Sequence, residues 1–148
     1  MLNVTGLTKS FGSGSNKLHV LKGIEMEIEK GEMVALMGPS GCGKSTLLNI
    51  IGGLLPGDKG NITLDGRNYG LKGPSSVVDV RRDLVGWIFQ DFHLLDNLTA
   101  LDNVAMALEL SGMNSHEAVT ASEHALERVG LGDRMHHIPD QLSGGQQQ

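Results

Sequence analysis

The chain has 148 residues, a formal net charge of −5 at pH 7 and one cysteine, Cys42. This length suffices for one domain with a hydrophobic core, and a single cysteine excludes an intrachain disulfide. The basic residues are scattered, which argues against general nucleic-acid binding. No apolar run approaches the ~18–20 residues that cross a bilayer, so we expect any membrane anchor to lie outside this chain.

The beginning of the chain predicts strands. Residues 1–7 are typical of a short strand, and the segment 12–16 (GSGSN) is typical of a flexible turn. Between residues 24 and 29, apolar residues alternate with glutamates, which predicts a half-buried, antiparallel strand. The continuous apolar run 33–37 instead favours a strand covered on both faces, as in a parallel sheet.

A helix and two further strands are expected next. Leucine and isoleucine recur at helical spacing between Leu47 and Leu55, although Gly52 and Gly53 weaken the end of this helix. An alternating segment then leads to the turn signal Asp65-Gly66. Residues 85–90 are typical of another buried strand.

The composition changes after Asn97, and the remainder predicts helices. Thr99 and Asp102 resemble a capping box at the start of one helix. Its predicted apolar face comprises Leu101, Val104, Ala105 and Leu108. A second helix is capped by Asn114 and ended by Gly130. Its predicted inner side comprises Ala118, Ser122, Ala125 and Val129.

A glycine-rich loop follows the apolar run 33–37. It matches the pattern G-x-x-x-x-G-K-[ST] with Gly38, Pro39, Ser40, Gly41, Cys42, Gly43, Lys44 and Ser45. Glycines let backbone N–H groups curl around phosphate oxygens, and the helix starting near Gly43 points its positive end at the anion. We expect Lys44 to reach the β- and γ-phosphates, Ser45 to ligate Mg²⁺, and Thr46 to add a phosphate contact. The sequence therefore predicts a nucleotide-binding P-loop.

Three further segments carry a family resemblance. Residues 142–146 (LSGGQ) are identical to the signature motif of ABC ATPases and lie about 100 residues after the P-loop, as in transporter cassettes. Phe89-Gln90 resembles the Q-loop of that family, and Phe11 stands where the family carries an aromatic residue that stacks on adenine. By these motifs and their order, the chain resembles the ATP-binding subunit of an ABC transporter.

The resemblance implies an α/β fold, with a P-loop NTPase core, an N-terminal antiparallel β subdomain and an α-helical subdomain. We expect one ABC ATPase domain over residues 1–148. About 1–97 would form the β and P-loop portion, and about 98–148 the helical subdomain up to the signature motif.

The resemblance also implies a head-to-tail dimer, in which each ATP lies between the P-loop of one subunit and the signature motif of the other. Ser143 and its neighbouring amides would form a second anion site at a helix N-terminus. The implied catalytic residues are Lys44, Gln90, Ser143 and Gly145. Besides residues 38–46, the implied ATP contacts are Phe11, Val20, Gln90, Ser143, Gly144, Gly145 and Gln146. Ser45 and Gln90 would contact Mg²⁺.

Residues 86–95 and 98–104 look like those of the lipoprotein-releasing and macrolide-export group of this family. The resemblance therefore implies a transmembrane permease partner and a peripheral position on the cytoplasmic face of the cell membrane, with no nucleic-acid partner. The transported substrate is not encoded in these segments, because cassettes of this group do not touch it.

The later motifs of the family do not occur in the chain: the Mg²⁺-associated aspartate, the adjacent catalytic glutamate and the switch histidine. We therefore expect the chain to be the N-terminal part of a longer protein and to be inactive alone. Two alternatives stay open, a non-transport cassette of the translation or repair type and a nucleotide-binding module without turnover. Repair-type proteins place long coiled coils between P-loop and signature, and translation-type cassettes occur in tandem pairs, whereas here one compact cassette is visible.

Overall fold

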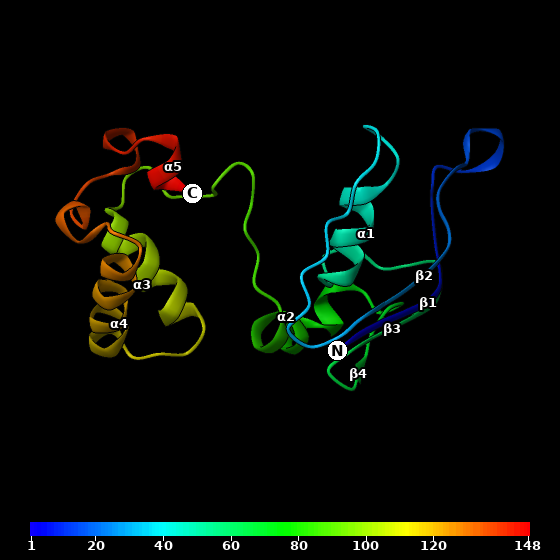
Figure 1. Ribbon diagram of the computed structural model, residues 1–148, viewed down its shortest axis with the longest axis horizontal. Coiled ribbons are helices and arrows are strands. Elements are labelled where there is room, and N and C mark those ends of the chain that lie inside the picture. Colours follow the sequence, from blue (N-terminus) through cyan, green and yellow to red (C-terminus); the bar gives the residue numbers. More distant parts are fainter. The chain divides into compact units, whose positions relative to one another are not determined.

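The computed structural model describes residues 1–148, which form two compact units, Met1–Trp87 and Ile88–Gln148. The first unit holds the β sheet with α1 and α2, and the second holds α3, α4 and α5 (Figure 1). The division falls before the change in composition near residue 97, because the loop preceding α3 is bonded to that helix: the Leu95 N–H donates to Asn103 Oδ1 at 2.8 Å. No helix of the chain has the length and apolar character needed to span a bilayer.

The sheet of the first unit is antiparallel, with the strand order β2-β1-β3-β4. Its strands are β1 (Leu2–Phe11), β2 (Leu18–Ile28), β3 (Lys59–Leu64) and β4 (Arg67–Asn68). The predicted strands at 1–7 and 24–29 are confirmed, but β1 and β2 are longer because their backbones continue to pair up to Phe11 and Leu18. The predicted Asp65-Gly66 turn is also confirmed, with φ angles of 47° and 81°.

The core of the first unit lies between this sheet and two helices, α1 (Lys44–Ile51) and α2 (Val78–Leu84). It contains Val4, Leu7, Leu21, Leu47, Ile50, Ile62, Tyr69, Val77 and Val80. The predicted helix is confirmed as α1, and it ends before Gly52-Gly53. Helix α2 was not predicted, because most of its residues are charged and only Val80 is buried. Two 3₁₀ turns, Gly14–Asn16 and Pro74–Ser76, lie in the connections.

Two expected strands are absent. Neither 33–37 nor 85–90 forms a strand, and Met33 is 97% exposed. The prediction of a parallel sheet from these runs is therefore wrong for this chain. A strand is stabilised by hydrogen bonds to a neighbouring strand, and no other segment of the chain pairs with either run. Apolar composition alone does not supply that neighbour.

The second unit is built on α3 (Ala100–Leu110) and α4 (Ser115–Arg128), which pack against each other. Both predicted caps are confirmed: Thr99 forms a capping box with Asp102, and Asn114 accepts from the N–H of Glu117 at 3.0 Å. The buried face of α4 is partly different from the prediction, since it consists of Ala118, Ser122 and Leu126. These positions are four residues apart, so Ala125 and Val129 are turned to the exposed side.

The rest of the second unit is a series of short helical turns. They are the 3₁₀ turns Gly132–Arg134 and Pro139–Gln141 and the one-turn helix α5 (Gly144–Gln147). Gly130 adopts a φ of 76° and ends α4, as predicted.

A buried cation ties β1 to the connection between α1 and β3. The ammonium of Lys9, a residue only 8% exposed, donates to the Pro56 carbonyl at 2.7 Å and to Asp58 Oδ1 at 3.1 Å. The other oxygen of Asp58 accepts from the Ser10 N–H at 2.7 Å. The bonded Lys9 ammonium, helped by this N–H, holds the pKa of the Asp58 carboxyl below its ordinary value.

This pair predicts a pH-dependent contribution to stability. Asp58→Asn should lower the free energy of unfolding by about 1–2 kcal/mol at pH 7. This loss is smaller than for a fully buried pair, because the Asp58 side chain is 39% exposed and water screens its charge. A carboxyl with a depressed native pKa stabilises the fold above its unfolded pKa of about 4 and loses that contribution as pH falls through the native value. Urea unfolding at pH 7 and at pH 3 should therefore show the difference shrinking in acid. A difference that stays constant would contradict the ion pair.

Candidate functional site

The P-loop leads directly into α1. Gly41 and Gly43 have φ angles of 78° and 101°, which L-residues rarely adopt, and α1 begins at Lys44. No side chain caps α1 at Gly43, and the first intrahelical bond of this turn is the one from the Leu47 N–H to the Gly43 carbonyl, at 2.9 Å. The preceding N–H groups of the helix thus remain available at its positive end, an arrangement suited to an anion.

Lys44 folds back onto the loop that precedes it. Its Nζ donates to the carbonyl oxygens of Gly38 at 2.7 Å and Pro39 at 2.8 Å, and it lies 3.8 Å from the sulfur of Cys42. The positive charge is therefore held at the loop and not extended into solvent.

Most of the predicted loop residues surround one hollow of about 260 Å³. It is lined by Val20, Ser40, Gly41, Gly43, Lys44, Ser45 and Thr46. The lining combines one ammonium, three hydroxyl groups and the start of α1, and it includes no carboxylate. Such a surface attracts an anion and offers hydroxyl oxygens to a hard cation.

Val20 reaches the hollow through an irregularity in the sheet. Lys9 pairs with Leu21 and Ser10 pairs with His19, so Val20 is the extra residue of a β-bulge in β2. A bulge re-aims a side chain, and a Cβ added at Gly43 would lie 2.9 Å from Cγ1 of Val20. The sequence predicted a nucleotide contact for Val20, but its close approach to Gly43 depends on this register shift, which no residue pattern announces.

Phe11 stands at the end of β1, opposite Leu18 of β2, and does not line the hollow. The residue is 42% exposed, and Nζ of Lys9 lies 5.5 Å from the centroid of its ring. The structure thus leaves Phe11 accessible at the rim of the sheet without placing it among the P-loop residues.

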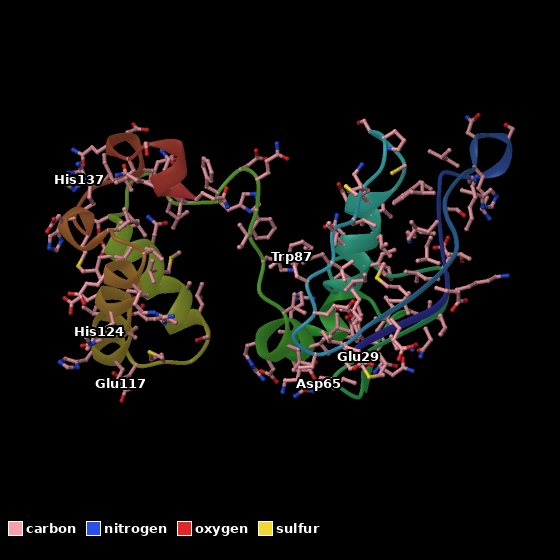
Figure 2. The ribbon with its side chains drawn as sticks, viewed as in Figure 1. Glu29, Asp65, Trp87, Glu117, His124 and His137 are labelled. Carbon is pink, nitrogen blue, oxygen red and sulfur yellow. The ribbon has the colours of Figure 1, made fainter.

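The far end of α1 is held by Tyr69 and Arg81, which the sequence did not single out, and by Trp87, which was expected in the core. The Tyr69 hydroxyl donates to the Ile51 carbonyl, and Nη1 of Arg81 donates to the Gly53 carbonyl at 2.9 Å. Burial, which leaves Tyr69 only 2% exposed, raises the pKa of its phenol to about 12. A Cβ added at Gly52 would clash with the ring of Trp87, the residue labelled in Figure 2. These contacts fix the end of α1 opposite the P-loop.

The signature residues form the start of α5. The Ser143 N–H donates to Oε1 of Gln146 at 2.9 Å, which confirms a helix beginning at this point. Nε2 of Gln147 donates to the carbonyls of Pro139 at 2.8 Å and Leu142 at 3.0 Å. A side chain added at Gly145 would meet nothing within 4 Å, so this glycine faces open space.

Gln90 lies in an exposed turn of the second unit and does not end a strand as predicted. The turn is unusual, since Phe92 and His93 both have positive φ angles, 55° and 57°. Backbone conformations of this kind cost free energy and are concentrated at functional sites. Gln90 and the signature residues belong to the second unit, whereas the P-loop, Val20 and Phe11 belong to the first.

A P-loop that leads into a helix of an α/β fold defines a nucleotide-binding protein. Comparison with known proteins agrees with this class. Residues 21–148 match the ABC transporter family, and the chain belongs to that family. Both the α/β fold expected from the sequence and the ATP-binding cassette are thereby confirmed.

Similar proteins include exporters and solved cassettes. The chain is 43% identical, over its whole length, to the macrolide export ATP-binding/permease protein MacB of a Shewanella species, of which it covers 23%. It is 45% identical to the ABC transporter ATP-binding protein MJ1508 of Methanocaldococcus jannaschii, of which it covers 66%. The ATP-binding cassette MJ0796, solved as a dimer bound to ADP and Pi, is 36% identical and superposes with a TM-score of 0.86 over 99% of this chain and 65% of that one.

The contact between Gly43 and β2 predicts a difference between two P-loop glycines. Gly41→Ala and Gly43→Ala both place a side chain at a positive φ, but only the second meets Val20 and Leu21, at 2.9 and 3.2 Å. We expect Gly43→Ala to lower the free energy of unfolding by about 1–3 kcal/mol more than Gly41→Ala, because overpacking adds to the backbone strain. Parallel urea titrations measure this. Equal losses would show that β2 yields freely at this contact.

Proposed function

We propose that the protein is the ATP-binding and hydrolysing cassette of an ABC transporter, which couples the nucleotide cycle to movement of a substrate by a membrane permease. The observation that carries the proposal is the P-loop hollow, with Lys44 held at the loop and uncapped N–H groups at the start of α1. Membership of the ABC transporter family and similarity to export proteins such as MacB support the coupling to transport.

The hollow fits ATP and Mg²⁺ by the chemistry of its donors. The exposed first turn of α1 and the Lys44 ammonium suit a polyphosphate, since both are positive and neither is blocked by a capping side chain. Ser45 offers a hydroxyl oxygen, a ligand type that Mg²⁺ takes together with phosphate oxygens and water. In this proposal Thr46 and the backbone of residues 38–43 bind phosphates, while Phe11 and Val20 contact the base.

The role of Mg²⁺ in such a site is to neutralise charge that develops on the transferred phosphoryl group. Lys44 would hold the β- and γ-phosphates in position for attack. Gln90 would orient the attacking water and contact the metal. No carboxylate lines the hollow, so the 148 residues alone would bind nucleotide with negligible turnover.

We further propose that Ser143, Gly144, Gly145 and Gln146 complete the site across a head-to-tail dimer. The solved cassette MJ0796 is dimeric, which supports this assembly. The open space beside Gly145 is compatible with a nucleotide brought by a second subunit.

The permease is proposed to receive the exposed segment that contains Gln90, at the cytoplasmic face of the membrane. MacB is an ATP-binding/permease protein, so a permease carried on the same polypeptide and a permease on a separate one both satisfy the proposal. The chain covers 23% to 66% of the relatives named above, so transport itself is a proposal for the full-length protein.

Lys44→Ala tests the phosphate site. Loss of one charge-assisted contact should weaken ATP binding about tenfold or more and abolish ATP hydrolysis in the full-length protein. Lys72→Ala is the matched control, because Lys72 is an exposed lysine whose side chain has no part in the loop. Isothermal titration with ATP and a phosphate-release assay give the two readouts. ATP affinity and turnover unchanged from the Lys72 control would remove Lys44 from the site.

Gly145→Asp tests the second half-site. The substitution has room in the folded subunit, and its carboxylate would repel the γ-phosphate of a nucleotide bound by the partner. We expect ATP binding to the monomer to persist within about twofold, while ATP-driven dimerisation and turnover are lost. Sedimentation of the full-length protein with and without ATP measures dimerisation. Gly73→Asp, which adds the same charge at another open glycine, should dimerise normally.

A further inference from the structure

The first turn of α3 bonds to more than its own helix. The Thr99 hydroxyl accepts from the Asp102 N–H at 3.1 Å, as any capping residue would. The N–H groups of Ala100 and Leu101 instead donate to the carbonyls of His137 and Met135, both at 2.9 Å. The labelled His137 belongs to the segment that leads toward α5 (Figure 2). The positive end of α3 therefore holds the backbone that precedes the signature residues.

Asn103, in the same turn, holds a different segment. Its Oδ1 accepts from the Leu95 N–H at 2.8 Å, and its Nδ2 lies 3.1 Å from the carbonyls of Leu95 and Leu98 and 3.0 Å from that of Thr99. Both polar atoms of one half-buried side chain thus serve the loop that follows Gln90. The cap of α3 does not need them, because Thr99 and Asp102 already form it.

The two held segments also meet each other. Nε2 of Gln148 lies 3.5 Å from the Phe89 carbonyl, and a Cβ added at Gly144 would lie 3.9 Å from the Phe92 ring. The loop containing Gln90 and the signature helix therefore share both an anchor on α3 and a direct contact. Chains of packed side chains and hydrogen bonds are the kind of network that carries coupling between segments, and these contacts form such a chain.

We propose that Asn103 is a positioning residue that joins the Gln90 loop to the signature helix through the first turn of α3. It touches neither ATP nor the reacting atoms. It sets where the signature residues stand relative to Gln90 within one subunit, so that a push on the loop reaches the phosphate-binding end of α5. This inference rests on the proposed function, because the signature and Gln90 act in hydrolysis only there.

The test compares Asn103→Ala with Asn114→Ala in the full-length protein. Asn114 is the same residue type in the same unit, and it caps α4 through the Glu117 N–H without reaching either loop. Asn103→Ala should lower kcat about tenfold or more, because small misplacements of reacting groups have large effects, while the dissociation constant for ATP stays within about twofold. Asn114→Ala should change kcat by less than about twofold at a comparable loss of Tm.

A second variant separates the bond from the bulk of the side chain. Asn103→Asp keeps the acceptor for the Leu95 N–H but sets a carboxylate against three carbonyl oxygens, so its kcat should fall below that of Asn103→Ala. Amide hydrogen exchange gives a readout independent of activity. The Asn103 variants should speed exchange both at Leu95 and in the amides of residues 144–147, whereas Asn114→Ala should speed it only in α4.

Faster exchange confined to the Leu95 loop, or a kcat equal to that of Asn114→Ala, would overturn the inference. So would a loss of ATP affinity in proportion to the loss of kcat, since that marks a general structural defect. These outcomes differ from failure of the proposed function, which would appear as no ATP hydrolysis by the unsubstituted protein or as hydrolysis that persists in Lys44→Ala.

Discussion

The nucleotide-binding end of the first unit depends on the close approach of Gly43 to β2. A hydrogen in place of a side chain lets the bulged Val20 and its neighbour Leu21 pack onto the start of α1. The same glycine takes the left-handed conformation from which the helix begins. This contact sets Val20 beside the first turn of α1, where Lys44 begins the helix and where the hollow is lined by both. At the opposite end Tyr69 binds the carbonyl of Ile51, the last residue of α1, and Arg81 binds the carbonyl of Gly53 just beyond it.

Stability and chemistry are separated along the first unit. The antiparallel sheet and α1 bury an apolar core, and Lys9 with Asp58 closes the connection that returns from α1 to the sheet. The residues proposed to meet nucleotide lie outside that core, at the loop and the bulge, where backbone groups remain exposed. In the second unit, Phe92 and His93 of the Gln90 loop have strained positive φ angles. Backbone strain is therefore found in a segment that is proposed to take part in function.

The second unit is organised around one helix terminus. The first turn of α3 satisfies its own N–H groups with Thr99 and with carbonyls from the segment before α5, and its Asn103 side chain satisfies the loop before the helix. Backbone groups in irregular segments must find partners, and a helix N-terminus with spare donors provides them. The loop that contains Gln90 and the segment that leads to α5 are distant in the sequence but are both bound to the first turn of α3. This shared attachment is the physical basis for the proposed coupling between them.

Local chemistry was readable from the sequence alone: the P-loop pattern, the caps at Thr99 and Asn114, the Asp65-Gly66 turn and the stop at Gly130 each depend on residues a few positions apart. The order of the P-loop and signature motifs was enough to indicate the family. The tertiary structure decided those features that depend on contacts with residues far away in the sequence. The apolar runs 33–37 and 85–90 are not strands because no strand pairs with them, and the inner face of α4 was settled by its packing on α3. The bulge at Val20 depends on strand register, and the bonds of Arg81 at the end of α1 join segments far apart in the chain. Those of Asn103 depend on how the loop before α3 folds back on the helix. A linear residue pattern records none of these.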